Sequence, residues 1–69
     1  MNQIPLTVNG EPRELAGPAT LADLVAELTR AAAGVAAAVN ETVVPRGAWS
    51  DTRLAAGDRV EILTAVQGG

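Results

Sequence analysis

Apolar and polar residues alternate at the start of the chain and predict a half-buried strand. The apolar side chains stand at positions 4, 6 and 8, which is the two-residue period of a strand with one covered face. Asn9 and Gly10 follow, and both tolerate the positive φ of a type I′ turn, so residues 11–15 should return as a second strand. Pro12 cannot donate a backbone hydrogen bond, which places that strand at a sheet edge. Pro5 has the same restriction, and we expect ordered pairing to begin after it.

The next apolar positions fall at helical spacing and predict one amphipathic helix. They recur at i, i+3, i+4 and i+7 and form a single stripe: Leu21, Leu24, Val25 and Leu28. Thr20 stands before the stripe as an N-cap, and Asp23 follows it by three residues, as in a capping box. Residues 31–33 are alanines that can extend the helix, and Gly34 suits the position after its C-terminus.

Short strands and turns are predicted for the middle of the chain. Residues 35–39 form a continuous apolar run between turn residues, which favours a buried strand. The dipeptide at 40–41 should turn the chain into a short segment over residues 42–44. Residues 46–54 are expected to be irregular, with Trp49 covering one end of the core.

A last strand is predicted over residues 59–66, after a turn that contains glycine. Apolar residues alternate along this segment, so Val60 and Ile62 should face the core while Leu63 and Ala65 face outward. The order of elements then indicates an α+β domain, a mixed sheet of four to five strands packed on one main helix. We expect residues 1–66 to form this domain and residues 67–69 to form a flexible tail.

The composition excludes most side-chain catalysis. The 69 residues include no Cys and no His, which removes disulfides, thiol nucleophiles, imidazole bases and nearly every zinc site. Trp49 is the only aromatic residue and the net charge is −3, so nucleic-acid binding is not expected. No apolar run reaches the ~20 residues of a membrane span, and no signal pattern opens the chain. We expect a cytoplasmic protein that is a monomer when free.

Three stretches carry a family resemblance: Val39-Asn40 followed by Val44-Pro45-Arg46 and Trp49, the Gly57-Asp58 turn, and the terminal Gly68-Gly69. In these stretches the chain resembles the sulfur carrier proteins of thiamine biosynthesis, the ThiS family of the β-grasp or ubiquitin-like group. The likeness spans nearly the whole chain in length and element order. It implies a five-stranded sheet around one helix, with the last strand central and its tail protruding.

The resemblance also implies a chemistry. The Gly69 carboxylate would be the reacting group, and Gly68 would give access to it. A ThiF-like adenylyltransferase would activate the carboxylate with ATP, and a sulfur donor such as a cysteine desulfurase would convert the acyl-adenylate to a thiocarboxylate. A ThiG-like thiazole synthase would then take the sulfur. The chain itself would bind no cofactor or metal, and it would be a carrier rather than an enzyme.

The residue types of the tail suit this chemistry. A terminal carboxylate has a pKa of about 3.3–3.7, so it is ionised at neutral pH and is a poor electrophile until it is activated. The chain has no Lys and no glycine-rich loop that could hold ATP, so a partner must supply the activating machinery. Two glycines lack Cβ atoms and can thread a narrow channel.

Five residues near the tail or on the surface are candidates for partner contacts. Leu63 and Ala65 would form an apolar docking patch, or would be ordinary exposed apolar side chains. Arg46 and Arg59 could support docking through ion pairs, or could be solvated surface charges. Gln67 belongs to the same outward face of the last strand.

Three other functions are compatible with the sequence. The small subunit of molybdopterin synthase shares the fold, the tail and the thiocarboxylate chemistry, and neighbouring genes would separate the two pathways. A ubiquitin-like protein modifier would form adducts with target amines through Gly69. A plain interaction or RNA-associated β-grasp module would keep its activity after Gly68 and Gly69 are deleted.

Overall fold

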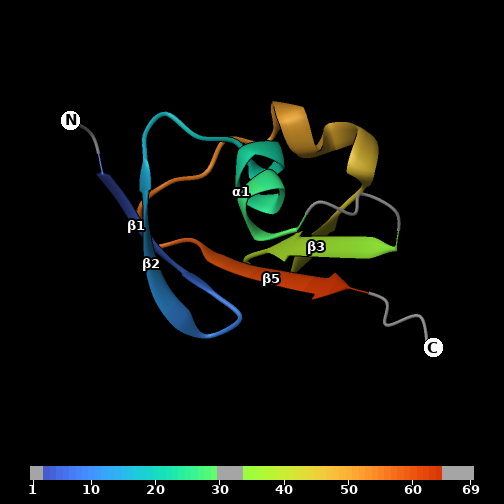
Figure 1. The fold of residues 1–69 in the computed structure, drawn as a ribbon, viewed down its shortest axis with the longest axis horizontal. Helices are drawn as coiled ribbons and strands as arrows, with labels where there is room; N and C mark the ends of the chain where they lie inside the picture. The colour runs from blue at the N-terminus through green and yellow to red at the C-terminus, as the bar shows by residue number, and fades with distance from the viewer. Residues whose placement is uncertain (1–2, 30–33, 65–69) are drawn as a thin grey trace.

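One mixed sheet of five strands, in the order β2-β1-β5-β3-β4, carries a helix and a 3-10 helix on one of its faces (Figure 1). The computed structural model describes residues 3–29 and 34–64. Within them the elements are β1 (Gln3–Val8), β2 (Glu11–Ala16), α1 (Leu21–Leu28), β3 (Val35–Val39), β4 (Thr42–Val44), η1 (Arg46–Asp51) and β5 (Arg59–Thr64). The last strand, β5, is central: it pairs in parallel with β1 and antiparallel with β3. The predicted α+β class and central last strand are confirmed.

The β1–β2 hairpin corrects one prediction, because pairing begins at Gln3 rather than after Pro5. Along β1, the backbone groups of alternate residues point away from β2, toward the turn that precedes β5: Thr7 N donates to Asp58 O at 3.1 Å, and Pro5 O accepts from Gly57 N at 2.7 Å. The nitrogen of Pro5 therefore also faces away from β2, and its missing proton removes no bond from the β1–β2 ladder.

The turn of this hairpin and its second strand follow the prediction. Asn9 and Gly10 have φ values of 52° and 83°, the left-handed backbone that a type I′ turn requires. Pro12 lies in β2, and β2 is an edge strand of the sheet. A proline is tolerated there because one side of an edge strand has no strand to bond.

The helix α1 begins with the predicted capping box. Thr20 Oγ1 accepts a hydrogen bond from Asp23 N at 3.2 Å, and Asp23 Oδ2 accepts one from Thr20 N at 3.0 Å. The helix ends at Leu28 because Thr29, a β-branched residue, takes an extended backbone. It therefore does not continue directly toward residues 31–33, which lie outside the described residues, and Gly34 precedes β3 rather than capping α1.

The core lies between the sheet and the two helical elements. Its buried side chains are Leu6, Val8, Leu15, Ala19, Leu21, Leu24, Val25, Ala37, Trp49, Leu54, Val60 and Ile62. Two predictions need correction. Residues 46–51 are not irregular but form η1, whose first bond runs from Ala48 N to Pro45 O at 2.8 Å. The strand β3 is not buried throughout: only Ala37 is buried among its five residues.

Trp49 covers the core as predicted, and its indole Nε1 donates to Val44 O at 2.9 Å. Both α1 and η1 lie on the same side of the sheet and contact each other, which leaves the opposite face open (Figure 1). Among the helices of the described ranges, none has the length and apolar character needed to cross a membrane.

Candidate functional site

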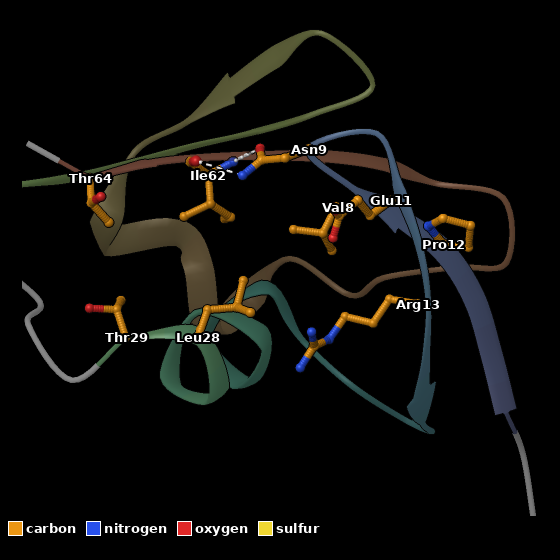
Figure 2. Close-up of a pocket in the computed structure, with 9 residues that line it drawn as sticks. All are labelled: Val8, Asn9, Glu11, Pro12, Arg13, Leu28, Thr29, Ile62 and Thr64. Atoms are coloured by element: carbon orange, nitrogen blue, oxygen red, sulfur yellow. Dashed lines mark hydrogen bonds between the residues drawn. The ribbon is translucent and has the colours of Figure 1, made fainter.

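The central strand β5 is the last element of the described chain and ends at Thr64. The contacts that hold β5 therefore determine the point from which the chain continues toward its C-terminus. Its pairing with β1 covers only two positions, Thr7 with Arg59 and Val8 with Val60. Beyond them, the side chain of Asn9 takes the place of a strand. Its Nδ2 donates to Ile62 O at 3.1 Å, and its Oδ1 accepts from Ile62 N at 2.9 Å (Figure 2).

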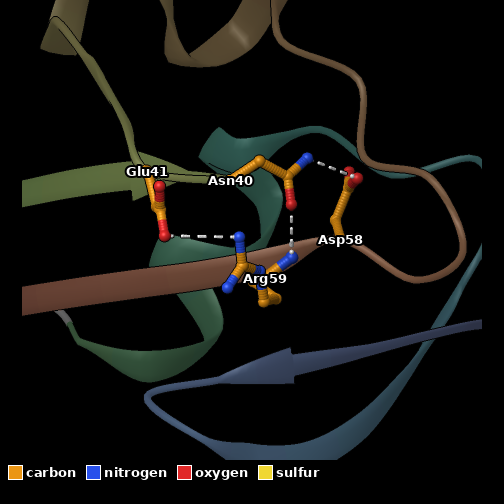
Figure 3. Close-up of polar contacts among 4 residues, drawn as sticks. All are labelled: Asn40, Glu41, Asp58 and Arg59. Atoms are coloured by element: carbon orange, nitrogen blue, oxygen red, sulfur yellow. Dashed lines mark hydrogen bonds and ion pairs between the residues drawn. The ribbon is translucent and has the colours of Figure 1, made fainter.

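A second asparagine holds β5 at its start. Asn40 Oδ1 accepts from Arg59 N at 3.0 Å, and Asn40 Nδ2 donates to Asp58 Oδ1 at 3.0 Å (Figure 3). Asp58 also accepts from Ala55 N at 2.8 Å, which closes the turn before β5. The β3–β4 turn is thereby tied to the first residues of β5, and the register of β5 against β3 is fixed at that end.

That register builds a shallow groove on the open face of the sheet. It places Leu63 opposite Ala36, and Ala38 between Glu61 on one side and Val43 on the other. The small alanine side chains form the floor, and the larger side chains of β5 and β4 stand around it, enclosing about 160 Å³. Leu63 and Val43 are 69% and 73% exposed, so the apolar walls of this alanine groove face solvent.

A larger cleft of about 350 Å³ lies on the other side of β5, between the β1–β2 hairpin and the end of α1 (Figure 2). Ile62 and Thr64 contribute its β5 wall, and Leu28 contributes its helical wall. Arg13 lines it as well, but its guanidinium already pairs with Glu27 at 3.5 Å. Thr64, the last residue of β5, therefore lines this cleft.

The structure places three of the sequence-predicted contact residues. Leu63 is exposed on the open face, as predicted. Arg59 lies on the same face, where its Nη2 pairs with Glu41 Oε2 at 3.5 Å in a solvated ion pair (Figure 3). Arg46 is exposed at the start of η1, which contacts α1, so it is not brought together with Leu63.

The other predicted site residues lie outside the described part of the chain. They are Ala65, Gln67, Gly68 and Gly69. The structure therefore describes the base from which the tail departs, with Thr64 at the end of the central strand.

Sequence reasoning missed the groove residues contributed by β3 and β4. Treating residues 35–39 as a buried strand hid the outward positions of Ala36 and Ala38. A signal was present, because a two-residue turn at 40–41 pairs Ala38 with Val43 and so predicts that the two share a face.

The polar and charged side chains of the described residues lie at the surface. Within them no group of three or more metal-binding side chains gathers, and no polar or charged side chain is buried. The residues described in the structure show an exposed apolar groove, a cleft and solvated ion pairs.

The five-stranded mixed sheet with one helix across it defines a β-grasp protein. The crystal structure of the thiamine biosynthesis protein (ThiS) from Geobacter metallireducens superposes with a TM-score of 0.77 at 35% identity, covering 96% of this chain and 100% of that one. A solution structure of a thiamine biosynthesis protein from the same organism gives a TM-score of 0.79 at 35% identity, covering 96% and 88% of the two chains.

Sequence comparison narrows this class to one family. The ThiS family model matches residues 6–69. The sulfur carrier protein ThiS of Escherichia coli (strain K12) is 30% identical over 61 residues, which cover 88% of this chain and 92% of that protein. The chain belongs to the ThiS family, the sulfur carriers of thiamine biosynthesis.

Proposed function

We propose that this chain carries sulfur for thiazole formation as a thiocarboxylate on Gly69. The single observation that carries the proposal is the family match over residues 6–69, which extends through both Gly68 and Gly69. In this proposal residues 1–66 are the recognised body and residues 67–69 are the tail that enters partner active sites. The ThiS match favours the thiamine pathway over the molybdopterin synthase alternative.

The chemistry requires activation by a partner. The Gly69 carboxylate is charged and resonance-stabilised, so a nucleophile cannot readily attack it. Attack of that carboxylate on ATP forms an acyl-adenylate and releases pyrophosphate, which removes the charge and supplies AMP as a leaving group. The persulfide of a donor such as a cysteine desulfurase then attacks the acyl carbon and displaces AMP, which gives an acyl disulfide. A thiol next attacks the donor-side sulfur of that S–S bond, which releases the thiocarboxylate and leaves a disulfide between the thiol and the donor. A ThiF-like adenylyltransferase would act before this transfer, and a ThiG-like thiazole synthase would act after it.

The body supports this proposal because it can present a tail without taking part in the reaction. β5 is central in the sheet, and the side chains of Asn40 and Asn9 bond its backbone at Arg59 and at Ile62, so the strand that precedes the tail is held in register. Side-chain bonds from Asn9 and Asn40 fix it without a covalent crosslink. Presenting a reactive group from a fixed base lowers the entropy that a partner must remove on binding.

Adenylation can be tested directly with the adenylyltransferase from the same cells. The full chain should release pyrophosphate from ATP and gain an acyl-AMP adduct, and a variant lacking Gly68 and Gly69 should do neither. Thermal unfolding of the two proteins should coincide, because the deleted residues lie beyond the folded strand β5. Equal pyrophosphate release from both proteins would refute the proposal.

A further inference from the structure

We propose that Asn9 is a modification site, at which spontaneous deamidation removes a side-chain contact that holds the central strand β5. Asn9 is followed by Gly10, and both residues are exposed in the turn of the β1–β2 hairpin. The amide group that this reaction destroys bonds the backbone of Ile62 through both its oxygen and its nitrogen (Figure 2). The reaction consumes only water, so it is independent of the chemistry proposed for Gly69.

The reaction begins at the backbone nitrogen of Gly10. That nitrogen attacks Asn9 Cγ and closes a succinimide ring, while the Cγ–Nδ2 bond breaks and ammonia leaves with the proton of Gly10 N. Water then opens the ring at either carbonyl and gives aspartate or isoaspartate, so water is consumed and ammonia is released. Glycine hinders this attack least among the amino acids, because it has no Cβ beside the attacking nitrogen.

Asn40 provides a comparison within the same chain. Asn9 and Asn40 have φ values of 52° and 51°, and both bond the backbone of β5 through the side-chain amide. The residue after Asn40 is Glu41, whose side chain crowds the attacking nitrogen. At Gly10, no heavy atom beyond the neighbouring residues lies within 4 Å of the position that a Cβ would take, so the turn is open to water. Asn9 is therefore the more reactive of the two.

The folded structure protects Asn9 from this reaction. Its Nδ2 donates to Ile62 O at 3.1 Å, and its Oδ1 accepts from Ile62 N at 2.9 Å. Ring closure makes Cγ tetrahedral and expels Nδ2, so it cannot proceed while the planar amide keeps both bonds. Deamidation thus requires a local opening of the turn, and its rate follows the population of that open state.

The product cannot restore the contact. An aspartate at this position still accepts from Ile62 N, but it has no amide proton for Ile62 O, and a carboxylate oxygen then faces that carbonyl oxygen. The pairing of β5 with β1 reaches only to Val60, whereas β3 still pairs with Leu63 and Thr64 on the other side. Deamidation therefore loosens β5 from the β1 side, at Ile62.

Incubation of the wild-type chain, folded and in urea at the same pH and temperature, tests the site and its protection. Peptide mapping by mass spectrometry locates each deamidated residue. In urea, Asn9 should react before Asn2 and Asn40. In the folded chain, Asn9 should react at least about 30-fold more slowly, because two hydrogen bonds of ordinary net strength must open first. Equal rates at Asn9 in both conditions would refute the protection, and earlier reaction at Asn40 would refute the site.

The effect on β5 is tested with Asn9→Asp, which tolerates the same backbone conformation. Its folding equilibrium constant in urea titrations should fall about ten-fold, and the deamidated wild-type fraction, isolated by anion exchange, should show a similar loss. Gln3→Glu is the matched control, because it adds the same charge at an exposed position of β1. Its stability should stay close to that of wild type. Wild-type stability in Asn9→Asp would overturn the proposed effect on β5.

Asn9→Gly separates this lesion from other ageing. It keeps the turn but has no side-chain amide to lose, so prolonged incubation should leave its stability unchanged while that of wild type declines. An equal decline in both proteins would place the damage elsewhere and refute the inference.

Discussion

Asparagine serves two purposes at once at positions 9 and 40. Both residues have φ near +50°, a conformation that costs most L-residues about 1–2 kcal/mol but that asparagine tolerates. Each also sends its side-chain amide to the backbone of β5, Asn9 at Ile62 and Asn40 at Arg59. Few other side chains could satisfy both the turn and the strand. Asn9 and Asn40 are both exposed, yet their side chains determine the position of β5.

Substitution of Asn9 separates the two contributions. Asn9→Ala should lower the free energy of unfolding by about 3 kcal/mol, because it loses two hydrogen bonds and places a Cβ-bearing residue at positive φ. Asn9→Gly accepts the backbone conformation and should lose only about 2 kcal/mol. Urea unfolding measures both. Wild-type stability in Asn9→Gly would show that the Ile62 bonds contribute nothing.

At the scale of elements, the sequence next to a helix or turn determines where it begins, and one or two hydrogen bonds to distant segments determine its position in the fold. The helix α1 begins at a complete capping box, and its first residues are tied to the segment after η1: Leu21 N donates to Thr52 O at 2.8 Å and Leu54 N donates to Ala19 O at 3.0 Å. The N-terminus of the helix is thus fixed to the rest of the fold, whereas its last residue, Leu28, is 37% exposed.

The cap gives a prediction at this scale. Thr20→Ala removes the side-chain acceptor for Asp23 N, so it should lower the free energy of unfolding by about 1 kcal/mol. Thr20→Ser retains a hydroxyl acceptor and should stay close to wild type. Thermal unfolding with circular dichroism compares the three proteins. Equal destabilisation by both substitutions would show that the methyl group, rather than the cap, carries the effect.

The elements predicted correctly from sequence were those specified by neighbouring residues. The Asn9-Gly10 turn, the Thr20 cap and the alternation around Val60 all depend on residues close along the chain. Two of the incorrect predictions, those for Pro5 and for β3, depended on distant contacts. Pro5 is tolerated because its nitrogen faces away from β2 and the pairing of β1 with β5 begins only at Thr7. β3 is covered on one face only, because both helical elements lie on that side of the sheet (Figure 1).

The candidate site divides in the same way. Leu63 could be predicted as outward-facing from the alternation of its own strand, and the structure confirms it. The groove around it could not, because Ala36, Ala38 and Val43 come from two other strands and meet Leu63 only through the sheet register. The roles of Gly68 and Gly69 stay predictions, since both lie outside the described residues.

At the scale of the whole molecule, one face of the sheet packs against the helical elements and the other is open (Figure 1). The covered face buries the apolar core against α1 and η1, including the fully enclosed Leu21, Leu24 and Val60. The open face carries the alanine groove, and the central strand between them ends at Thr64, five residues before Gly69. The residues that form the core are therefore largely separate from those that line the alanine groove.

The central claim is that the reacting atom belongs to the Gly69 carboxyl group. Intact mass spectrometry of the chain, isolated from its own cells with thiazole synthase deleted so that the carrier stays loaded, tests it most directly. The account predicts a chain ending at Gly69 whose mass shows one oxygen replaced by sulfur, with fragmentation locating the sulfur at that residue. A chain that carries only the ordinary carboxylate there, or that continues past Gly69, would contradict it.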